Sequence, residues 1–261
     1  MIKTTIPKKS GGVRIIYAPN RKEKFNLQIK VPALNAAQLA ICGPNVHGFI
    51  PGRSPVTNAI PHIGYQFTLC ADLKDFFDTC TKGMIPKAVA VEDLEFPDGA
   101  TRQGLPTSPA LANLAAAQMD VEIGDFCQKF SIPVYTRYAD DLTFSCNDRA
   151  ALWHLRFNLP AMVSKHGFTL NRKKTRLQWA GPDGDWSRVV TGVAVGKSAI
   201  RPTRAVKRRL RAARHQGHEA QADGLAEWCR LKLPNPAGSP RISKVQLAVA
   251  RAVTKRLVTS A

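Results

Sequence analysis

Residues 134–146 have the sequence VYTRYADDLTFSC, the strongest indication of local structure in this chain. Two runs rich in β-forming residues, 134–139 and 142–146, are separated only by Asp140 and Asp141. Such a short polar break predicts a β-hairpin with two aspartates at its tip. Aspartate is also a common turn residue for local hydrogen-bonding reasons, so this pair alone does not establish a catalytic site.

The segments around this hairpin predict alternating strands and helices. Residues 66–72 are a strand candidate that ends on Asp72, and Ser108-Pro109 is a typical start for a helix. The remaining expected elements are helices over 24–40, 109–129 and 150–165, an extended segment over 168–171 and a strand over 189–195. This order predicts an α+β domain, an antiparallel sheet with helices on one face.

Acidic side chains end both the predicted strand 66–72 and the predicted hairpin. If these strands are neighbours in one sheet, Asp72, Asp140 and Asp141 gather at one edge, where like charges repel unless cations bind. Mg²⁺ prefers oxygen ligands and retains waters that substrate phosphates can replace. The three acids therefore predict a two-metal site for phosphoryl transfer, with two Mg²⁺ ions or with Mn²⁺ as a substitute.

The charge of the chain is strongly positive and unevenly distributed. There are 38 Lys and Arg against 19 Asp and Glu, for a net charge of +19. Residues 1–69 carry nine basic residues and one acid, residues 196–261 carry fifteen and three, and the residues between them carry fourteen and fifteen. Such a cationic field concentrates polyanions, so nucleic acid is the leading expected partner. An acidic membrane surface and charge that serves only solubility are the alternatives.

Other compositional features favour a cytoplasmic globular protein. Hydrophobic residues make up 44% of the chain, yet no apolar run approaches the roughly 18 to 20 residues that span a bilayer. No apolar leader with a cleavage site follows Met1, so export is not expected. The six cysteines lie singly and lack zinc-site spacing, which predicts reduced thiols.

The C-terminal region is predicted to be helical and cationic. Residues 204–214 place Val206, Leu210 and Ala213 on one helical face and basic residues on the other. A second helix is expected over residues 241–257, after an irregular proline-rich connection over 233–240.

Five short motifs occur in the order typical of reverse transcriptases, which the chain resembles over about residues 6–215. They are ADLKDFF (71–77), QGLPTSP (103–109), YADD (138–141), LNRKKT (170–175) and VTG (190–192). The resemblance implies a right-hand polymerase with basic fingers, an RRM-like antiparallel palm and a short helical thumb. The implied boundaries are 1–68 with 80–104 for the fingers, 69–79 with 105–196 for the palm, and 197–261 for the thumb.

The resemblance implies RNA-templated addition of deoxynucleotides to a hydroxyl primer, with release of pyrophosphate. Asp72 and Asp140 would hold the two metal ions, with the main-chain carbonyl of Leu73 as a further ligand. Asp141 would add negative charge and coordination. One metal would lower the pKa of the primer hydroxyl, and the other would neutralise the triphosphate and the leaving pyrophosphate.

Several cations match positions that contact the triphosphate in this family. Lys8, Lys9 and Arg14 resemble the cations of the fingers, and Arg14 is favoured because it begins a predicted strand. A solvated run of charge is the alternative for the two lysines. Lys174 matches the lysine that neutralises or protonates the leaving pyrophosphate, and Lys173 is a near-equal candidate.

Two further motif positions would lie against the incoming nucleotide. Phe77 matches the bulky side chain beneath the sugar, where a ring would collide with a 2′-hydroxyl. An ordinary core aromatic is the alternative reading, and Phe76 is the better core candidate. The turn at Gln103 and Gly104 would let main chain approach the nucleotide and template base, with Gln103 supplying a polar contact. The same residues could simply lead into a capped helix.

Two more matches are typical of retron reverse transcriptases, bacterial enzymes that copy part of a structured RNA made beside them. Asn58 and His62 fit an NAxxH pattern, and residues 190–192 fit a VTG pattern; both regions bear on recognition of the cognate RNA in that group. His62 could equally be a hydrogen-bonded loop histidine. The residues expected to recognise RNA are Asn58, His62, Val190, Thr191, Gly192, Arg204, Lys207, Arg208 and Arg211.

The retron resemblance also implies synthesis from the 2′-hydroxyl of a guanosine, a role in anti-phage defence and an accessory effector protein. The expected partners are a structured RNA, the RNA–DNA hybrid and deoxynucleoside triphosphates, without a membrane. A group II intron-like or other defence-associated reverse transcriptase with different priming is one alternative. A non-catalytic RNA-binding protein on a polymerase scaffold is another.

Overall fold

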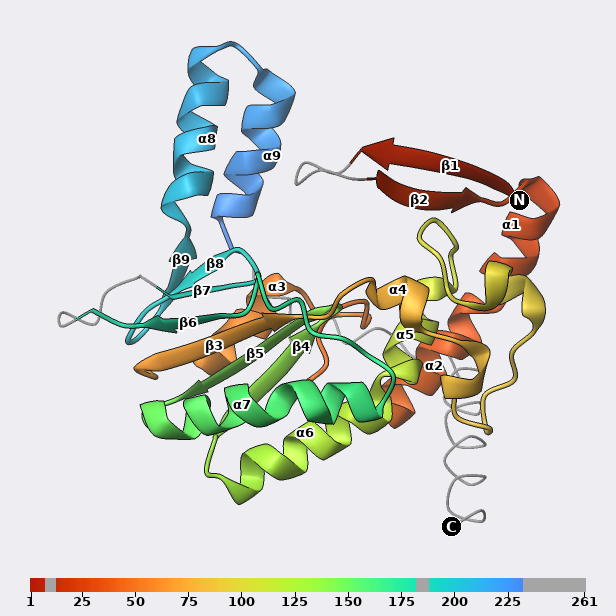
Figure 1. The fold of residues 1–261 in the computed structure, drawn as a ribbon. Coiled ribbons are helices and arrows are strands. Elements are labelled where there is room, and N and C mark those ends of the chain that lie inside the picture. The colour runs from red at the N-terminus through yellow and green to blue at the C-terminus, as the bar shows by residue number, and fades with distance from the viewer. Residues whose placement is uncertain (8–12, 182–187, 232–261) are drawn as a thin grey trace.

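The computed structural model describes residues 1–7, 13–181 and 188–231, and Figure 1 shows their arrangement. Its centre is an antiparallel sheet in the order β4-β5-β3-β6. The strands are β3 (Phe67–Asp72), β4 (Val134–Tyr138), β5 (Asp141–Cys146) and β6 (Arg176–Trp179). The predicted strand 66–72 and the predicted hairpin are confirmed. Asp141 is the first residue of β5, so Ala139 and Asp140 form the tip of the hairpin.

Helices cover one face of this sheet. The helical layer contains α6 (Ala117–Lys129) and α7 (Arg149–Lys165), with α5 (Ser108–Ala115) and α2 (Val31–Ile41) beside them (Figure 1). Because side chains alternate along a strand, Leu69, Ala71, Leu142 and Phe144 all point to this face and join the main hydrophobic core. The opposite face carries Asp72 and Asp141. The predicted α+β class, with helices on one face of an antiparallel sheet, is therefore confirmed.

Two predicted helices are each divided in the structure. The helix expected over 24–40 is α1 (Arg21–Gln28) followed by α2, because the ring of Pro32 cannot continue the preceding helix. Asn20 and Glu23 form a capping box that begins α1 earlier than expected. The helix expected over 109–129 is α5 followed by α6, and the break at Ala116 is slight because its N–H still donates to Ala112.

A second, smaller sheet corrects the prediction of one strand over 189–195. It contains β7 (Arg188–Val190), β8 (Val193–Val195) and β9 (Ile200–Pro202), all antiparallel. Thr191 and Gly192 have φ values of 45° and 80° and reverse the chain between β7 and β8. A two-residue turn with both φ values positive matches the right-handed twist of a hairpin, so the VTG motif is a turn and not part of a strand.

Two peripheral hairpins flank the sheets. The β-hairpin of β1 (Ile2–Pro7) and β2 (Val13–Ala18) lies at one end, and the helical hairpin of α8 (Arg204–His215) and α9 (Glu219–Cys229) rises from the smaller sheet (Figure 1). The helix predicted over 204–214 is confirmed. The helix predicted over 241–257, the connection over 233–240, Lys8 and Lys9 lie outside the described residues.

Short elements complete the described chain. They are α3 (Pro55–Ala59), α4 (Phe76–Thr79) and the 3₁₀ turns η1 (Ile60–His62), η2 (Lys82–Met84), η3 (Asp93–Glu95) and η4 (Pro97–Gly99). All six cysteines are free thiols. Within the described ranges, no helix combines the length and apolar character needed to cross a bilayer.

Candidate active site

The three predicted acids meet where β3 and β5 lie side by side. Asp72 ends β3 and stands directly opposite Asp141, which begins β5. The main-chain N–H of Leu73 donates to the carbonyl of Asp140 at 2.9 Å, which ties the hairpin tip to the chain after β3. Residues separated by some 70 positions in sequence thus form one acidic edge. The sheet register brings Asp72 and Asp141 together, and the turn adds Asp140.

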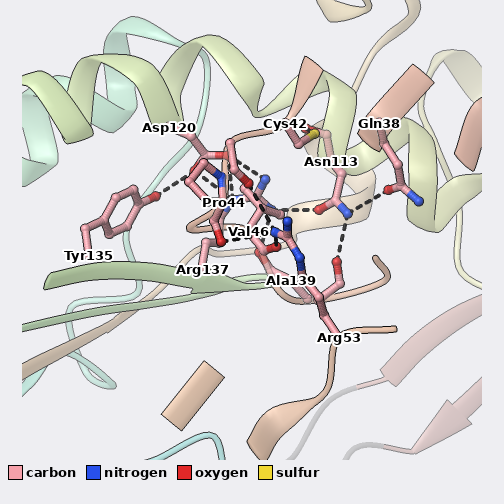
Figure 2. Close-up of polar contacts among 12 residues, drawn as sticks. Gln38, Cys42, Pro44, Val46, Arg53, Asn113, Asp120, Tyr135, Arg137 and Ala139 are labelled. Carbon is pink, nitrogen blue, oxygen red and sulfur yellow. Dashed lines mark hydrogen bonds and ion pairs between the residues drawn. The ribbon is translucent and has the colours of Figure 1, made fainter. Parts of the chain in front are cut away.

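Ala139 gives the turn before Asp140 its shape. Its φ is 56°, a left-handed conformation that costs free energy for a residue with a Cβ. Nη1 of Arg137 donates to the carbonyl of Ala139 at 3.1 Å, as Figure 2 shows. Gly48 packs so closely on this turn that a Cβ at position 48 would collide with the main-chain nitrogen of Ala139. Contacts from two sides therefore hold the strained turn.

Arg137 is fully buried and neutralised by Asp120 of α6. Its Nε and Nη2 donate to the Asp120 carboxylate at 2.8 and 2.7 Å, and its Nη1 donates to Oδ1 of Asn113 at 2.9 Å. The Tyr135 hydroxyl donates to the same carboxylate at 2.6 Å (Figure 2). Burial alone would lower the pKa of Arg137, but Asp120 more than offsets this and raises it. The ion pair links the helical layer to the acidic turn.

A cleft of about 800 Å³ opens beside these acids. Asp72, Asp140, Lys174, Arg14 and Gln103 contribute to its lining. The β1–β2 hairpin supplies Arg14 from one side, and the sheet edge supplies the acids from the other. The cleft therefore places a cation from the N-terminal hairpin opposite carboxylates from the central sheet, an arrangement suited to a triphosphate with its metal ions.

Lys174 is the lysine that the structure brings to the acids. Its Nζ lies 2.7 Å from Oδ1 of Asp72, and this hydrogen-bonded ion pair raises the pKa of Lys174. The N–H of Asn171 donates to the Asp72 carbonyl at 2.7 Å, so the loop that carries the lysine is docked on the end of β3. Lys173 is exposed and does not line the cleft. Of the two candidates in the LNRKKT motif, Lys174 has the geometry to act at this site.

The carboxyl groups at the hairpin tip are electrostatically strained. Burial and the neighbouring Asp140 and Asp72 raise the pKa of Asp141 to about 6. Burial, with a contribution from Asp72, also raises the pKa of Asp140. A divalent cation would relieve this repulsion, because it favours the ionised form of each oxygen ligand. Strained, adjacent carboxylates beside a cleft fit Mg²⁺ chemically.

The described residues do not contain three His, Cys, Asp or Glu side chains already closed around one point as a metal cluster. The ammonium of Lys174 instead supplies positive charge at Asp72. Asp72 and Asp140 line the cleft, whereas Asp141 lines a second pocket with Tyr138 and Arg176. These three carboxylates are the donors available to a metal at this edge. The carbonyl of Leu73, a predicted ligand, belongs to a residue that also lines the cleft.

Asp141→Asn should stabilise the metal-free protein. A raised pKa means that the folded state binds the proton more tightly than the unfolded chain does. The ionised carboxylate therefore lowers the free energy of unfolding once the pH exceeds its ordinary pKa of 3.8, and the loss is complete above about pH 6. We expect a gain of about 1 kcal/mol at pH 7.5, modest because the side chain retains solvent exposure. Thermal denaturation with EDTA, from pH 4 to pH 7.5, measures it.

The gain from Asp141→Asn should grow as the pH rises and vanish near pH 4. Asp125→Asn is the matched control, since Asp125 is exposed on α6 outside the cleft. A variant that is less stable than the wild type at pH 7.5 would contradict the assignment of repulsion at this edge.

Phe76 and Phe77 occupy different environments on α4. Phe76 is 4% exposed and belongs to the main core, as predicted. Phe77 is partly buried, its ring centroid is 5.7 Å from that of Phe49 and its carbonyl accepts from the Thr101 hydroxyl at 2.7 Å. Phe77 lies two residues after Asp75, which lines the cleft, but Phe77 itself does not line it. Its role as a sugar gate stays a prediction.

The Gln103-Gly104 turn packs against the N-terminal hairpin. Gly104 has a φ of 102°, and a Cβ there would collide with the carbonyl of Tyr17 in β2. The Tyr17 N–H donates to the Gln103 carbonyl at 2.9 Å. The close approach that requires glycine is therefore to β2, while Gln103 lines the cleft and remains available to a nucleotide.

Three residues expected to recognise RNA are buried in the protein. His62 is fully buried, and its ring nitrogens lie 2.8 Å from the hydroxyls of Ser145 and Thr136. Burial, with the nearby Arg188, lowers the pKa of His62 to about 3, so the ring is neutral. This corrects the expectation of direct RNA contact in favour of the hydrogen-bonded alternative, because no ring atom is free for RNA.

The same correction applies to Asn58 and Val190, which are also fully buried. Asn58 Nδ2 donates to the Thr191 hydroxyl at 3.4 Å, and that hydroxyl donates to the Pro55 carbonyl at 3.2 Å. The NAxxH and VTG segments thus contact each other, which the sequence did not predict. Of the five predicted residues in these two segments, Thr191 and Gly192 keep exposed surface, at the turn.

The cationic face of α8 is exposed, as predicted. Arg204, Lys207, Arg208 and Arg211 all lie on the solvent side, and Ala213 is buried on the opposite side. Sequence reasoning missed the Asp120–Arg137–Asn113 network and Phe49. The position of Arg137, a charged residue inside a run of β-forming residues, indicated that it needs a buried partner. The sequence could not identify Asp120 and Asn113, because they lie on two separate helices.

Residues 95–207 match the protein family described as reverse transcriptase (RNA-dependent DNA polymerase). The chain is 35% identical to the retron Mx65 reverse transcriptase of Myxococcus xanthus, over 92% of this chain and 62% of that protein. It is 28% identical to the retron Ec86 reverse transcriptase of Escherichia coli, over 88% of this chain and 74% of that protein. For the retron Mx162 reverse transcriptase of M. xanthus, the identity is 31% and the chain spans 51% of the relative.

The fold is similar to that of solved polymerases. Telomerase from Candida tropicalis, in complex with a fragment of telomeric RNA, superposes with a TM-score of 0.53 over 99% of this chain and 53% of that chain, at 12% sequence identity. This likeness supports the predicted polymerase-like α+β fold. The acidic edge of the central sheet, the ordered motifs and these relatives together make the chain similar to bacterial retron reverse transcriptases, of which it spans between 51% and 74% of the length.

Proposed function

We propose that this chain is an RNA-directed DNA polymerase that adds deoxynucleotides to a hydroxyl primer and releases pyrophosphate. The observation that carries the proposal is the register of β3 and β5, which sets Asp72 opposite Asp141 beside a cleft that also holds Arg14 and Lys174. Most catalysis of this kind comes from positioning and electrostatics, which this cleft supplies.

The three acids and two of the cleft cations each have a defined task in the proposed mechanism. Asp72, Asp140 and Asp141 would hold two Mg²⁺ ions, which when bound acidify the primer hydroxyl and neutralise the triphosphate. Arg14 would bind the triphosphate from the fingers side. The Lys174 ammonium, now on Asp72, would move to the leaving pyrophosphate and stabilise or protonate it.

The proposed parts of the polymerase are those that the resemblance to reverse transcriptases implies. We assign the fingers to residues 1–68 with 80–104, the palm to 69–79 with 105–196 and the thumb to 197–261. In the described part, the β1–β2 hairpin would close over the nucleotide, and the cationic face of α8 would hold the RNA or hybrid by its phosphates.

The direct test supplies purified protein with an RNA template, an annealed primer, Mg²⁺ and the four deoxynucleotides. Extension that copies the template and that disappears after ribonuclease treatment of the template supports the proposal. Synthesis that persists without a template would indicate an untemplated polymerase, and the absence of any extension with either Mg²⁺ or Mn²⁺ would contradict polymerase activity.

The retron type is the more specific part of the proposal. It is supported by the Mx65 and Ec86 relatives and would entail priming from a guanosine 2′-hydroxyl of a structured RNA, a cytoplasmic setting, an effector partner and anti-phage defence. Sequencing the nucleic acid that copurifies with the protein tests it. A short DNA joined to RNA through a branch supports the retron type, whereas linear products favour a group II intron-like or other priming mode.

Phe77→Val should relax selection against ribonucleotides. If the ring lies beneath the incoming sugar, its removal makes room for a 2′-hydroxyl, and we expect the preference for deoxynucleotides in kcat/KM to fall by about 100-fold. Single-nucleotide incorporation with dCTP and CTP measures the ratio. Phe157→Val is the control, because Phe157 is an exposed ring on α7. An unchanged ratio in Phe77→Val would contradict the gate.

Neutralising Arg208 and Arg211 together should weaken RNA binding without favouring any sequence. Each phosphate contact that is lost reduces the slope of log K against log salt concentration by about one unit. The double Gln variant should therefore reduce that slope by about two. Fluorescence anisotropy with a structured RNA at several salt concentrations measures this. Lys129→Gln with Arg149→Gln removes the same charge from exposed positions of the helical layer and should leave the slope unchanged.

A further inference from the structure

Phe49 is an aromatic residue in the loop between α2 and α3 that touches the proposed sugar gate. Its ring centroid lies 5.7 Å from that of Phe77, with an angle of 48° between the ring planes. Phe77 also contacts the buried Phe76, at 5.9 Å. Phe77 thus contacts one ring of the main core and one ring that is 39% exposed.

The main chain of Phe49 is in an unfavourable conformation. Its φ is 61°, in the left-handed region that bulky residues rarely adopt. A residue stays there only when the surrounding structure determines its position, and such residues concentrate at ligand-binding and catalytic sites. The backbone strain at Phe49 therefore calls for contacts strong enough to hold it.

Those contacts come from buried amides. Nε2 of Gln38 donates to the Phe49 carbonyl at 3.1 Å, and Nδ2 of Asn113 donates to the Gly48 carbonyl at 2.8 Å. Asn113 also donates to Oε1 of Gln38 at 3.0 Å (Figure 2). Gln38 and Asn113 are fully buried, so these hydrogen bonds have no competition from water.

The same network holds the turn before Asp140. Arg137 Nη1 donates both to Oδ1 of Asn113 and to the carbonyl of Ala139. Gly48, which precedes Phe49, lies directly against the main chain of Ala139. The main chain at Gly48 and Phe49 is therefore fixed relative to the acidic turn by the packing of Gly48 on Ala139 and by a chain of hydrogen bonds through Asn113 and Arg137.

We propose that Phe49 is a positioning residue for sugar selection, which sets the Phe77 ring at a fixed distance from the metal-binding turn. The inference rests on the proposed polymerase function. Steric exclusion of one oxygen atom works only if the excluding ring cannot retreat, and Phe49 and Phe76 both pack against the Phe77 ring. Loss of the Phe49 ring would give Phe77 freedom to yield to a 2′-hydroxyl.

The test measures kcat/KM for dCTP and for CTP on a primed RNA template. Phe49→Ala should lower the preference for dCTP about tenfold while kcat/KM for dCTP falls less than threefold. Phe49→Asn lacks the ring but tolerates a positive φ, and it should lower the preference as the alanine variant does. Phe49→Tyr keeps the ring and should retain the wild-type ratio. Phe25→Ala, which removes an exposed ring on α1, is the control and should change nothing.

The double variant Phe49→Ala with Phe77→Val should discriminate no worse than Phe77→Val alone, because the two rings act as one unit. An unchanged ratio in Phe49→Ala, or an equal loss for both nucleotides, would overturn the proposal and leave the polymerase function standing. Phe77→Val without an effect would overturn it as well. Wild-type protein that extends no primer would instead refute the polymerase function, and the inference would fall with it.

Discussion

Asp140→Ala should abolish primer extension, lowering kcat by at least about a thousandfold. The carboxylate lies at the hairpin tip and lines the cleft with Asp72, so its loss removes a metal donor from the edge where both are proposed to act. Metal ions supply several kcal/mol of transition-state stabilisation in phosphoryl transfer, and each 1.4 kcal/mol is about tenfold in rate. Single-turnover extension with saturating Mg²⁺ measures the loss.

The Asp140→Ala protein should remain folded. Its carboxyl group has a raised pKa, so its ionised form is a source of strain that the alanine removes. Circular dichroism and RNA binding at the wild-type level would show that only catalysis is lost. Asp125→Ala removes an exposed acid from α6 and should retain full activity. An Asp140→Ala protein that extends primers at the wild-type rate would refute the assignment of the active site.

Arg137→Met should destabilise the protein by about 3–5 kcal/mol and lower Tm by about 10 °C. The substitution keeps an apolar stem but leaves the Asp120 carboxylate buried without its cation, and an uncompensated buried charge is costly. The Ala139 carbonyl and Asn113 also lose a donor. Chemical and thermal denaturation measure the change.

A double variant separates the ion pair from the packing. Arg137→Met with Asp120→Leu removes both charges, so it should recover a large part of the stability lost in Arg137→Met. Activity should not recover in parallel, because the Ala139 carbonyl would still lack its hydrogen bond. A single Arg137→Met variant within 1 kcal/mol of the wild type would show that the network contributes little to stability.

The elements of the central sheet and its helical layer were predictable because their signals are local. The strand ending on Asp72, the YADD hairpin and the helix over 150–165 each carry their pattern within a single segment, and all three are present. The helix predicted over 24–40 is present but divided near Pro32, whose ring cannot continue the preceding helix. The strand predicted over 189–195 failed because Thr191 resembles a strand residue yet adopts a left-handed conformation beside Gly192.

The buried polar contacts were not predictable in this way. His62 matched a motif, but its hydrogen bonds run to Ser145 and Thr136, more than 70 residues away. Arg137 lies within a predicted strand, and the residues near it in sequence do not indicate Asp120 or Asn113 as its partners. Phe49 belongs to no motif, and its contact with Phe77, its positive φ and its hydrogen bond from Gln38 are visible only in the structure.

By itself, the sequence determined the α+β order of elements, the positive flanks and the identity of the three acids, because side-chain period, turn chemistry and charge are properties of short segments. The tertiary structure decided which residues meet. The antiparallel register set Asp72 opposite Asp141. The loop after Asn171 placed Lys174, and not Lys173, beside Asp72. His62 and Asn58 are buried in the interior and not exposed to solvent. These outcomes depend on contacts between distant segments, which exist only once the sheet has formed and buried its helical face.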